Sequence, residues 1–352
     1  MSMKNLLISS TKKNAGKTAL GLGICLNLEG KKGYFKPLSD KIVVKEDRIY
    51  DEDSKLFRTV LELREKEEEI SIFHDYAGIL REISRDPDKK ESIKKELKRR
   101  FEEIRRDRKF VIVESAQNAS YGLYAGLSAG DIAKELNLRS IIVAEGDIEN
   151  IIDKTVMCRY FLNSFGVNLD GVVINKVKNR KEIEDIVVPE LKNRGIDVLG
   201  ILPYEKILSG IIVEDVVDIL GANLLTGEKG LERRIDKVFI GAMSTESALS
   251  YLRRYANKAI ITGGDRVDMQ LTALETSTSC LILTGGIYPG PQVIAKAEKL
   301  NIPVMLVSED TFSASKRFEN ITAKIEAKDR KKIETIKKMV KENVDLSKLE
   351  GE

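Results

Sequence analysis

Residues 5–28 read NLLISSTKKNAGKTALGLGICLNL, and this stretch decides the fold of the chain. Its first part, Leu6-Leu7-Ile8, is a short apolar run with the length and flanks of a buried strand. The polar residues 9–15 interrupt that run, and Gly-Lys-Thr at 16–18 then opens a segment with apolar residues every four positions. Such spacing is typical of a helix packed by one face. The stretch therefore predicts a strand, a turn and a helix in direct succession.

A glycine-rich turn between a strand and a helix is the setting of a phosphate-binding loop. Its backbone N–H groups and the helix dipole favour negative charge at one point. Gly16 would let the backbone approach a phosphate, Lys17 would contact the β- and γ-phosphates, and the Thr18 hydroxyl would coordinate Mg²⁺. The candidate nucleotide contacts in this turn are Thr11, Lys12, Asn14, Ala15, Gly16, Lys17 and Thr18. The alternative is an ordinary strand–turn–helix in which GKT occurs by chance.

Composition excludes several classes of protein. A chain of 352 residues with 33% charged and 42% hydrophobic residues has an ordinary globular composition and is long enough for two or three domains. Its net charge of +3 is too small to argue for nucleic-acid binding. No apolar run approaches the roughly 20 residues that cross a bilayer, and Met1 to Lys4 lead straight into the first strand without a signal peptide. We therefore expect a cytoplasmic protein without membrane contact.

Cysteine and histidine content narrows the chemistry further. The three cysteines, Cys25, Cys158 and Cys280, are far apart and fit no metal or redox spacing, which favours reduced, buried thiols. His74 is the only histidine, so histidine-based catalytic triads and multi-histidine zinc sites are excluded. A single histidine is more typical of a surface or core position than of a catalytic residue.

Further polar residues follow predicted strands. Lys36 ends the strand that begins at Gly33, and Glu114 ends the buried strand 110–114. Ligands of open α/β sheets bind at the carboxyl ends of strands, so both side chains are site candidates, with Mg²⁺ the natural partner of Glu114. Lys36 could instead be solvated beside a proline turn. Asp51 and Asp53 start a helix, where acidic residues are favoured by the dipole even without a metal.

The remaining pattern of the first two hundred residues alternates strands and helices. Apolar strands are predicted at 140–144, 171–177 and 197–204, and the charged segment 81–109 carries a narrow helical stripe that predicts a solvated helix lying on the sheet. Alternation of this kind predicts an α/β fold with a mostly parallel sheet, joined by right-handed crossovers with helices on both faces.

Five motifs in order give residues 1–206 a resemblance to dethiobiotin synthetase, a P-loop NTPase-like enzyme family. They are the P-loop, Tyr-Phe-Lys-Pro at 34–37, Val-Ile-Val-Glu at 111–114, Gly-Val-Val-Ile-Asn at 171–175 and Val-Leu-Gly-Ile-Leu-Pro-Tyr at 198–204. The resemblance implies that Thr18, Asp53 (or Asp51) and Glu114 bind Mg²⁺. It also implies that Lys36 assists the chemistry and that Asn175 reads the adenine.

Two departures from that family affect function. Thr11 stands where the common P-loop has glycine, and Ser115-Ala116-Gln117-Asn118 replaces a glycine-rich turn that contacts the small-molecule substrate. Lys12, five residues before Lys17, resembles the lysine of deviant P-loops. In the related MinD-type ATPases a lysine at this spacing reaches the nucleotide of the partner subunit; for this chain, Lys12 reaching across the interface of a homodimer is a hypothesis.

The second part of the chain, residues 207–330, resembles a DRTGG domain, a smaller α/β unit. Apolar strands at 237–243, 260–266, 280–286 and 302–307 include two Thr-Gly-Gly turns, at 262–264 and 284–286. These glycines could bind an anion at a helix start, or could merely permit tight turns. DRTGG domains commonly serve as regulatory and dimerising modules. Residues 331–352 are predicted to form a charged C-terminal tail.

The combination of both parts resembles the amino-terminal regulatory half of long bacterial phosphotransacetylases and stand-alone archaeal and cyanobacterial proteins. It implies a regulator that binds ATP and Mg²⁺, responds to a nucleotide or small metabolite, and acts on a protein partner in acetate or central carbon metabolism. Only a charged segment follows residue 330, so acetyl transfer is not expected. One alternative is an ATP-dependent ligase that activates a carboxylate or carbamate with Lys12, Lys17 and Lys36 as catalytic cations. Another is a scaffold with a degenerate nucleotide site, which Thr11 permits.

Overall fold

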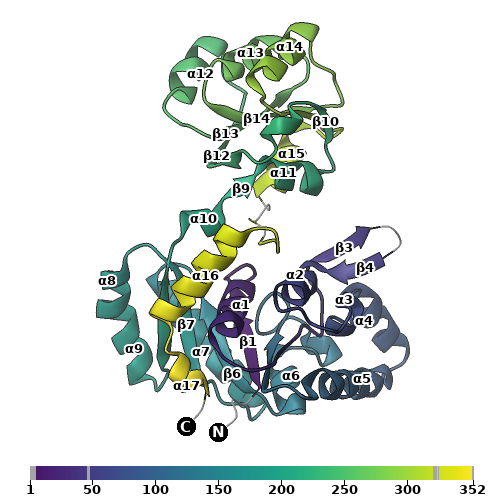
Figure 1. Ribbon diagram of the computed structural model, residues 1–352, viewed down its shortest axis with the longest axis vertical. Coiled ribbons are helices and arrows are strands. Elements are labelled where there is room, and N and C mark those ends of the chain that lie inside the picture. The colour runs from purple at the N-terminus through teal and green to yellow at the C-terminus, as the bar shows by residue number, and fades with distance from the viewer. Residues whose placement is uncertain (1–4, 46–47, 320–322, 324, 351–352) are drawn as a thin grey trace. The chain divides into compact units, whose positions relative to one another are not determined.

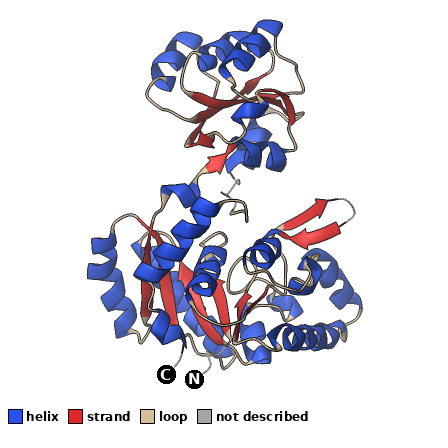
Figure 2. Ribbon diagram, in the orientation of Figure 1, coloured by secondary structure: helices blue, strands red, loops and turns tan. Residues whose placement is uncertain are grey.

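A computed structural model describes residues 5–45, 48–319, 323 and 325–350 of the chain (Figures 1 and 2). The chain divides into two compact units. The first contains the residues up to 205 together with those from 325 onward, and the second contains residues 206–324. Each unit is an α/β body with its own apolar core.

The first unit is built on a six-stranded parallel sheet with the strand order β2-β5-β1-β6-β7-β8. Its strands are β1 (Leu6–Ser10), β2 (Lys32–Phe35), β5 (Phe110–Glu114), β6 (Arg139–Ala144), β7 (Gly171–Val177) and β8 (Val198–Pro203). Each of these strands lies within or next to an apolar run predicted from the sequence. Strand β1 is central and pairs with β5 and β6. All of its residues are buried, as expected for a parallel strand that is covered on both faces. The prediction of a mostly parallel sheet is confirmed.

Helices cover both faces of this sheet, as predicted. They are α1 (Lys17–Asn27), α2 (Glu52–Val60), α3 (Glu67–Ile70), α4 (Tyr76–Arg85), α5 (Lys89–Arg105), η1 (Leu123–Ala125), α6 (Ala129–Leu136), α7 (Ile148–Ser164), α8 (Arg180–Glu182), η2 (Ile183–Val187), α9 (Val188–Asn193), α16 (Arg330–Asn343) and α17 (Leu346–Glu350). Leu7 and Val113 point to the face covered by α5, α6 and α7. Ile8 and Ile112 point to the other face, where α1 lies so close that a side chain added at Gly21 would meet both of them.

The C-terminal segment departs from the expected tail. Residues 330–343 form α16, which packs against α1 and β8 of the first unit (Figure 1). Ile336, Met339 and Val340 are buried at this contact, while Lys337, Lys338 and Lys341 of the same helix are exposed. The three apolar residues form one helical stripe, so the segment is an amphipathic helix with a binding face rather than a free charged tail.

A two-stranded hairpin that the sequence analysis did not predict precedes α2. It consists of β3 (Ile42–Lys45) and β4 (Arg48–Asp51), which pair antiparallel. Its last residue, Asp51, is the N-cap of α2: the carboxylate accepts hydrogen bonds from the backbone N–H groups of Asp53 and Ser54. The hairpin thus places Asp51, and with it Asp53 in the first turn of α2, near the end of β2.

The second unit contains a five-stranded sheet with the order β10-β15-β14-β13-β12, in which only β10 is antiparallel. Its strands, including the small pair β9–β11, are β9 (Ile211–Ile212), β10 (Asn223–Thr226), β11 (Arg234–Ile235), β12 (Lys237–Ile240), β13 (Lys258–Gly263), β14 (Thr278–Thr284) and β15 (Val304–Leu306). Its helices are α10 (Lys206–Ser209), α11 (Val213–Leu220), η3 (Glu228–Gly230), α12 (Thr245–Leu252), α13 (Val267–Leu274), α14 (Pro291–Leu300) and α15 (Thr311–Glu319). Helices α11 and α15 pack on one face, and α12, α13 and α14 on the other.

Two expectations about composition also have structural counterparts. Cys25, Cys158 and Cys280 are all free and buried, as predicted. Across the described part of the chain, none of the helices combines the length and the apolar character that spanning a membrane requires.

Candidate functional site

The turn between β1 and α1 is shaped by residues in the left-handed backbone region. Gly16 is the N-cap of α1 with a φ of 107°, and Asn14 has a φ of 61°. A side chain at position 16 would overlap the amide nitrogen of Asn175, so both the dihedral angle and the packing require glycine there. Thr11, which stands where many such loops have glycine, needs no special conformation: its N–H donates to the carbonyl of Val143 at 3.0 Å. Its hydroxyl is buried and lacks a partner among the described residues.

Lys17 and Thr18 point inward from the start of α1. The Lys17 ammonium lies 3.1 Å from the Ser10 hydroxyl and 2.8 Å from the carbonyl oxygen of Gln117. Burial lowers the pKa of Lys17, although the nearby Glu114 carboxylate opposes this shift. A buried ammonium held only by neutral oxygens retains capacity for an anion.

Glu114 ends β5 opposite the first turn of α1. One carboxylate oxygen accepts from the Thr18 hydroxyl at 3.1 Å, and the other accepts from the Tyr34 hydroxyl at 2.9 Å. The ring of Tyr34 stacks on Phe57 with a centroid distance of 3.6 Å, which fixes the direction of its hydroxyl. Burial, followed by the negative charge of Asp53, raises the pKa of Glu114 to about 7. Thr18 and Glu114 were both predicted as metal ligands, and their oxygens lie side by side.

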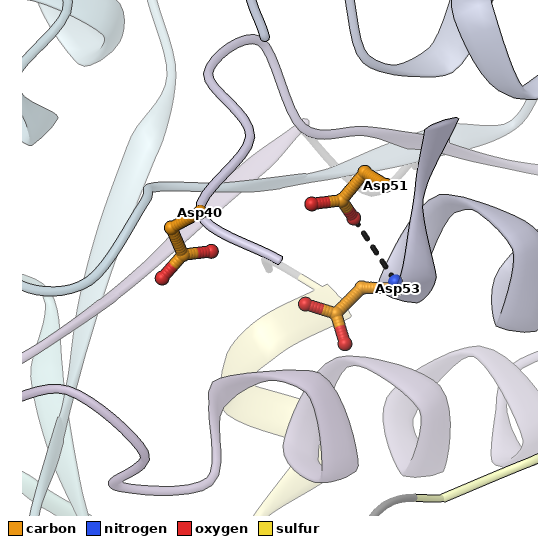
Figure 3. Close-up of side chains that lie close together, drawn as sticks. All are labelled: Asp40, Asp51 and Asp53. Carbon is orange, nitrogen blue, oxygen red and sulfur yellow. Dashed lines mark hydrogen bonds between the residues drawn. The ribbon is translucent and has the colours of Figure 1, made fainter. Parts of the chain in front are cut away.

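Three carboxylates surround the buried Lys36 at the end of β2. Its ammonium lies 2.6 Å from Asp53, 2.7 Å from Asp40 and 3.0 Å from Asp51. Figure 3 shows how these three acidic side chains converge, with the bond from Asp51 to the Asp53 N–H that caps α2. Ligand oxygens of the three carboxylates lie within 4.8 Å of one another. Burial alone would lower the pKa of Lys36, but the acidic neighbours outweigh it and hold that pKa well above its usual value.

Asp40 and Lys41 belong to this group but were missed in the sequence analysis. Asp40 accepts a hydrogen bond from the N–H of Gln117 at 3.0 Å and pairs with Lys36. Burial would raise the pKa of Asp40, yet Lys36 and Lys17 together hold it below its usual value. Lys41 lies 3.0 Å from Asp53. Both residues follow the Lys36-Pro37 turn directly, so the only sequence signal was a charged pair in the loop after β2.

Asn175 and Lys12 occupy the other side of the turn. The Asn175 amide donates to the carbonyl of Ala15 at 2.8 Å, so this side chain connects β7 to the turn 11–18. Lys12 is 41% exposed and pairs at 3.3 Å with Glu145, a residue that the sequence analysis did not single out. Glu145 also lies 2.9 Å from Lys176, whose ammonium donates to the carbonyl of Asn14.

The site therefore falls into two neighbouring groups. One consists of Lys17, Thr18 and Glu114 at the start of α1; the other is the cluster around Lys36 that includes Asp53. Both oxygens of Asp53 are engaged by lysines, Lys36 on one and Lys41 on the other. Direct metal ligation by Asp53 stays a prediction and would require at least one of these ion pairs to open.

Two family models match the sequence, in the regions that correspond to the two structural units. A model described as an AAA domain matches residues 4–211, and one described as a DRTGG domain matches residues 215–321.

Relatives of known name match parts of the chain. A phosphate acetyltransferase from Pseudomonas putida is 24% identical over 255 residues, which are 67% of this chain but 36% of that protein. An ATP-dependent dethiobiotin synthetase from Methanococcus vannielii is 25% identical over 57% of this chain and 94% of its own length. The chain thus spans about a third of the acetyltransferase and nearly all of the synthetase.

A solved structure provides one further likeness. It contains the CBS and DRTGG domains of the regulatory region of a Clostridium perfringens pyrophosphatase, with 22% identity and a TM-score of 0.27 over 42% of this chain and 71% of that one. Because the AAA domain model covers more than half of the sequence, the chain belongs to that family of P-loop domains, here followed by a DRTGG domain.

Proposed function

We propose that the first unit binds ATP together with Mg²⁺ at the turn 11–18, and that the protein is a nucleotide-responsive regulator. The turn supports polyphosphate binding because Lys17 is buried with only neutral oxygens as hydrogen-bond partners. The start of α1 adds the positive end of a helix dipole. The similarity to phosphate acetyltransferases supports a protein partner in acetate or central carbon metabolism.

The residues beside Lys17 fit a magnesium ion. Thr18 and Glu114 present a hydroxyl and a carboxylate oxygen 3.1 Å apart, and hard oxygen ligands are those that Mg²⁺ prefers. Bound Mg²⁺ would neutralise charge on the phosphates. Asn175 would act on the nucleotide side by fixing the carbonyl of Ala15 and thereby the shape of the turn.

The neutralisation of Lys36 is the observation that favours a regulator over a ligase. A ligase that activates a carboxylate needs free cations beside the γ-phosphate to hold its acidic substrate. Here the Lys36 ammonium already contacts three carboxylates of its own chain and is 1% exposed. One of them, Asp40, also occupies the N–H of Gln117. The chain itself thus supplies the anions that a substrate would otherwise bring.

The exposed Lys12 supports a homodimer in which this side chain reaches a second nucleotide site. Its pairing with Glu145 is a partly exposed ion pair, and such pairs contribute only about 0–1 kcal/mol. Lys12 can therefore leave Glu145 when a better anion is offered across a dimer interface.

Calorimetric titration of the full chain with ATP and Mg²⁺ tests the binding site. We expect Lys17→Ala to weaken ATP affinity at least ~100-fold, since charge-assisted bonds to phosphate are lost. Lys13→Ala is the matched control, because Lys13 lies exposed in the same turn, and it should change affinity less than about threefold. Equal affinities for both variants would refute the proposed nucleotide site.

Turnover separates the regulator from the ligase. Phosphate release from ATP is measured with the full chain alone and with a panel of small carboxylic and amino acids. The proposed regulator binds ATP without stimulation by any member of the panel. Stimulation by one acid, abolished by Lys36→Met, would establish the ligase instead.

A further inference from the structure

The second unit has a groove at the amino ends of β13 and β14, on the opposite edge of its sheet from the two Thr-Gly-Gly turns. The groove has a volume of about 520 Å³, within the range of roughly 300–1,000 Å³ typical of small-molecule sites. Arg233 and Arg234 line one part of it, residues 276–279 another, and Leu274 and Ile302 provide apolar walls. No motif in the sequence analysis pointed to this region.

The two arginines carry charge that acidic side chains do not neutralise. Arg233 donates to the carbonyl oxygens of Thr278 at 3.3 Å and Leu300 at 2.9 Å. Arg234 donates to the carbonyl oxygen of Lys206 at 2.6 Å. Within the described ranges, no carboxylate lies at ion-pair distance from either guanidinium. A guanidinium has five N–H donors, so both side chains retain donors and full charge for an anion.

Asp236, an acidic residue that interacts with Arg234, is already engaged by other partners. Asp236 interacts electrostatically with Arg234, but its carboxylate lies 3.3 Å from Lys206 and accepts from the Asn257 amide at 3.0 Å. The fully buried Lys258, which pairs with the groove residue Thr278 in the sheet, is a further cation in this region. Its ammonium donates to the carbonyl oxygens of Tyr255 and Ser277.

An irregularity in the sheet fixes this arrangement. Lys258 pairs with Thr278, but the next residue, Ala259, pairs with Cys280, so Ser279 is the additional residue of a β-bulge. The Ser279 hydroxyl donates to the backbone carbonyl of Arg234 at 2.6 Å and ties the arginine segment to the bulge. Bulges commonly redirect side chains next to functional sites. The two guanidinium groups are thus held by fixed backbone rather than carried on a free loop.

We propose that this groove binds a small organic anion, with its phosphate or carboxylate group on Arg233 and Arg234 and its apolar or aromatic body against Leu274 and Ile302. Guanidinium groups match the geometry of both kinds of anion, and the apolar walls exclude a bare inorganic ion as the best ligand. Leu274 and Ile302 are each 3% exposed, so the surrounding structure holds both residues in place and each presents only a small apolar surface to the groove. The proposal is independent of ATP binding in the first unit.

Titration of the full chain with AMP and with phenylacetate tests this site, in the Lys17→Ala background to suppress nucleotide binding at the turn 11–18. We expect at least one of them to bind with a dissociation constant below about 1 mM. Binding of AMP alone identifies a phosphate ligand, and binding of phenylacetate alone a carboxylate. If neither binds at about 10 mM, the proposal is wrong.

A negative charge introduced at the rim of the groove tests where the anion binds. Ser277→Glu places a carboxylate in the groove at an exposed position, and we expect it to weaken binding at least ~10-fold. Ser250→Glu is the matched control, because Ser250 is exposed in the same unit but does not line the groove. Arg233→Gln should also weaken binding by a similar factor. Equal affinity in wild type and Ser277→Glu would place the ligand elsewhere and overturn the proposal.

Discussion

At the scale of single residues, Glu114 lies in an environment that disfavours its charged form while no cation is bound. Its two oxygens accept hydrogen bonds from Thr18 and Tyr34, yet its environment is buried and contains the negative charge of Asp53. With a pKa of about 7, Glu114 is present in both its neutral and its charged form near pH 7 while no cation is bound. This is the behaviour expected of a carboxylate whose charge is needed only when a metal is bound.

The pH dependence of stability tests this interpretation of Glu114. Its pKa in the folded protein is about 7, against an ordinary value of 4.5, so its contribution to stability is complete below about pH 4.5 and is lost as pH rises through 7. At pH 8 we expect the free energy of unfolding of Glu114→Gln, measured with urea, to exceed that of wild type by roughly 1–3 kcal/mol. At pH 5 the two proteins should be equally stable. Measurements are made in chelator, with the exposed Glu91→Gln as control.

Lys36 illustrates the opposite balance. Its ammonium compensates three buried carboxylates, so its removal leaves uncompensated charge in the interior. We expect Lys36→Met to lower the free energy of unfolding by about 3–5 kcal/mol at pH 7. Lys41→Met, which removes a partly exposed lysine paired with Asp53 alone, should cost less than about 1 kcal/mol. A smaller loss for Lys36→Met than for Lys41→Met in urea unfolding would show that the cluster does not depend on this cation.

At the scale of elements, α16 packs directly on α1, the helix that follows the turn 11–18. Gly23 of α1 leaves no room for a side chain against Val340, and the Asn27 amide donates to the carbonyl of Lys337 at 2.8 Å. The segment after α16 adds an N–H···O bond from Asp345 to Leu199 of β8. A displacement of α16 would therefore bear on α1 and on the sheet edge together.

Truncation of a buried contact measures this attachment. Val340 is fully buried, and Val340→Ala should lower stability by about 1–3 kcal/mol and increase hydrogen exchange in residues 330–343. Lys338→Ala is the control on the exposed side of the same helix and should stay within about 0.5 kcal/mol of wild type. Unchanged exchange in Val340→Ala would mean that this packing does not hold α16 in place.

At the scale of the whole molecule, the second unit is an insertion in the first. The chain leaves the first unit after residue 205 and returns to it at residue 325. The first unit is therefore discontinuous in sequence, because α16 follows the second unit along the chain. Two segments of the chain, on either side of residues 206–324, connect the units.

Separate production of the two units tests this organisation. Residues 206–324 contain a complete sheet and both of its apolar layers, so they should fold alone with cooperative unfolding. Residues 1–205 lack α16 and should unfold at least about 10 °C below the full chain, because the surface that α16 covers is exposed. Thermal unfolding of each fragment, followed by circular dichroism, measures both the cooperativity and the melting temperature. A fragment 1–205 as stable as the full chain would contradict the structural role of α16.

Much of the site could be predicted because it lies in short motifs with local geometry. Lys17 and Thr18 follow Gly16 directly, and Glu114 ends an apolar strand, so each lies at the edge of the sheet where the sequence analysis placed it. Asp40, Glu145 and the arginines of the groove lie in segments without such a pattern. Their significance comes from partners such as Gln117, 77 residues from Asp40 along the chain.

By itself, the sequence determined the alternation of strands and helices, the parallel sheet and the strand–turn–helix at residues 6–27, because these depend on neighbours within a few residues. Only the tertiary structure decided that Lys36 is neutralised by three carboxylates and that residues 330–343 pack on α1. The strength of a charge depends on which charges lie near it in space, and a stripe of apolar residues does not specify the surface that it covers.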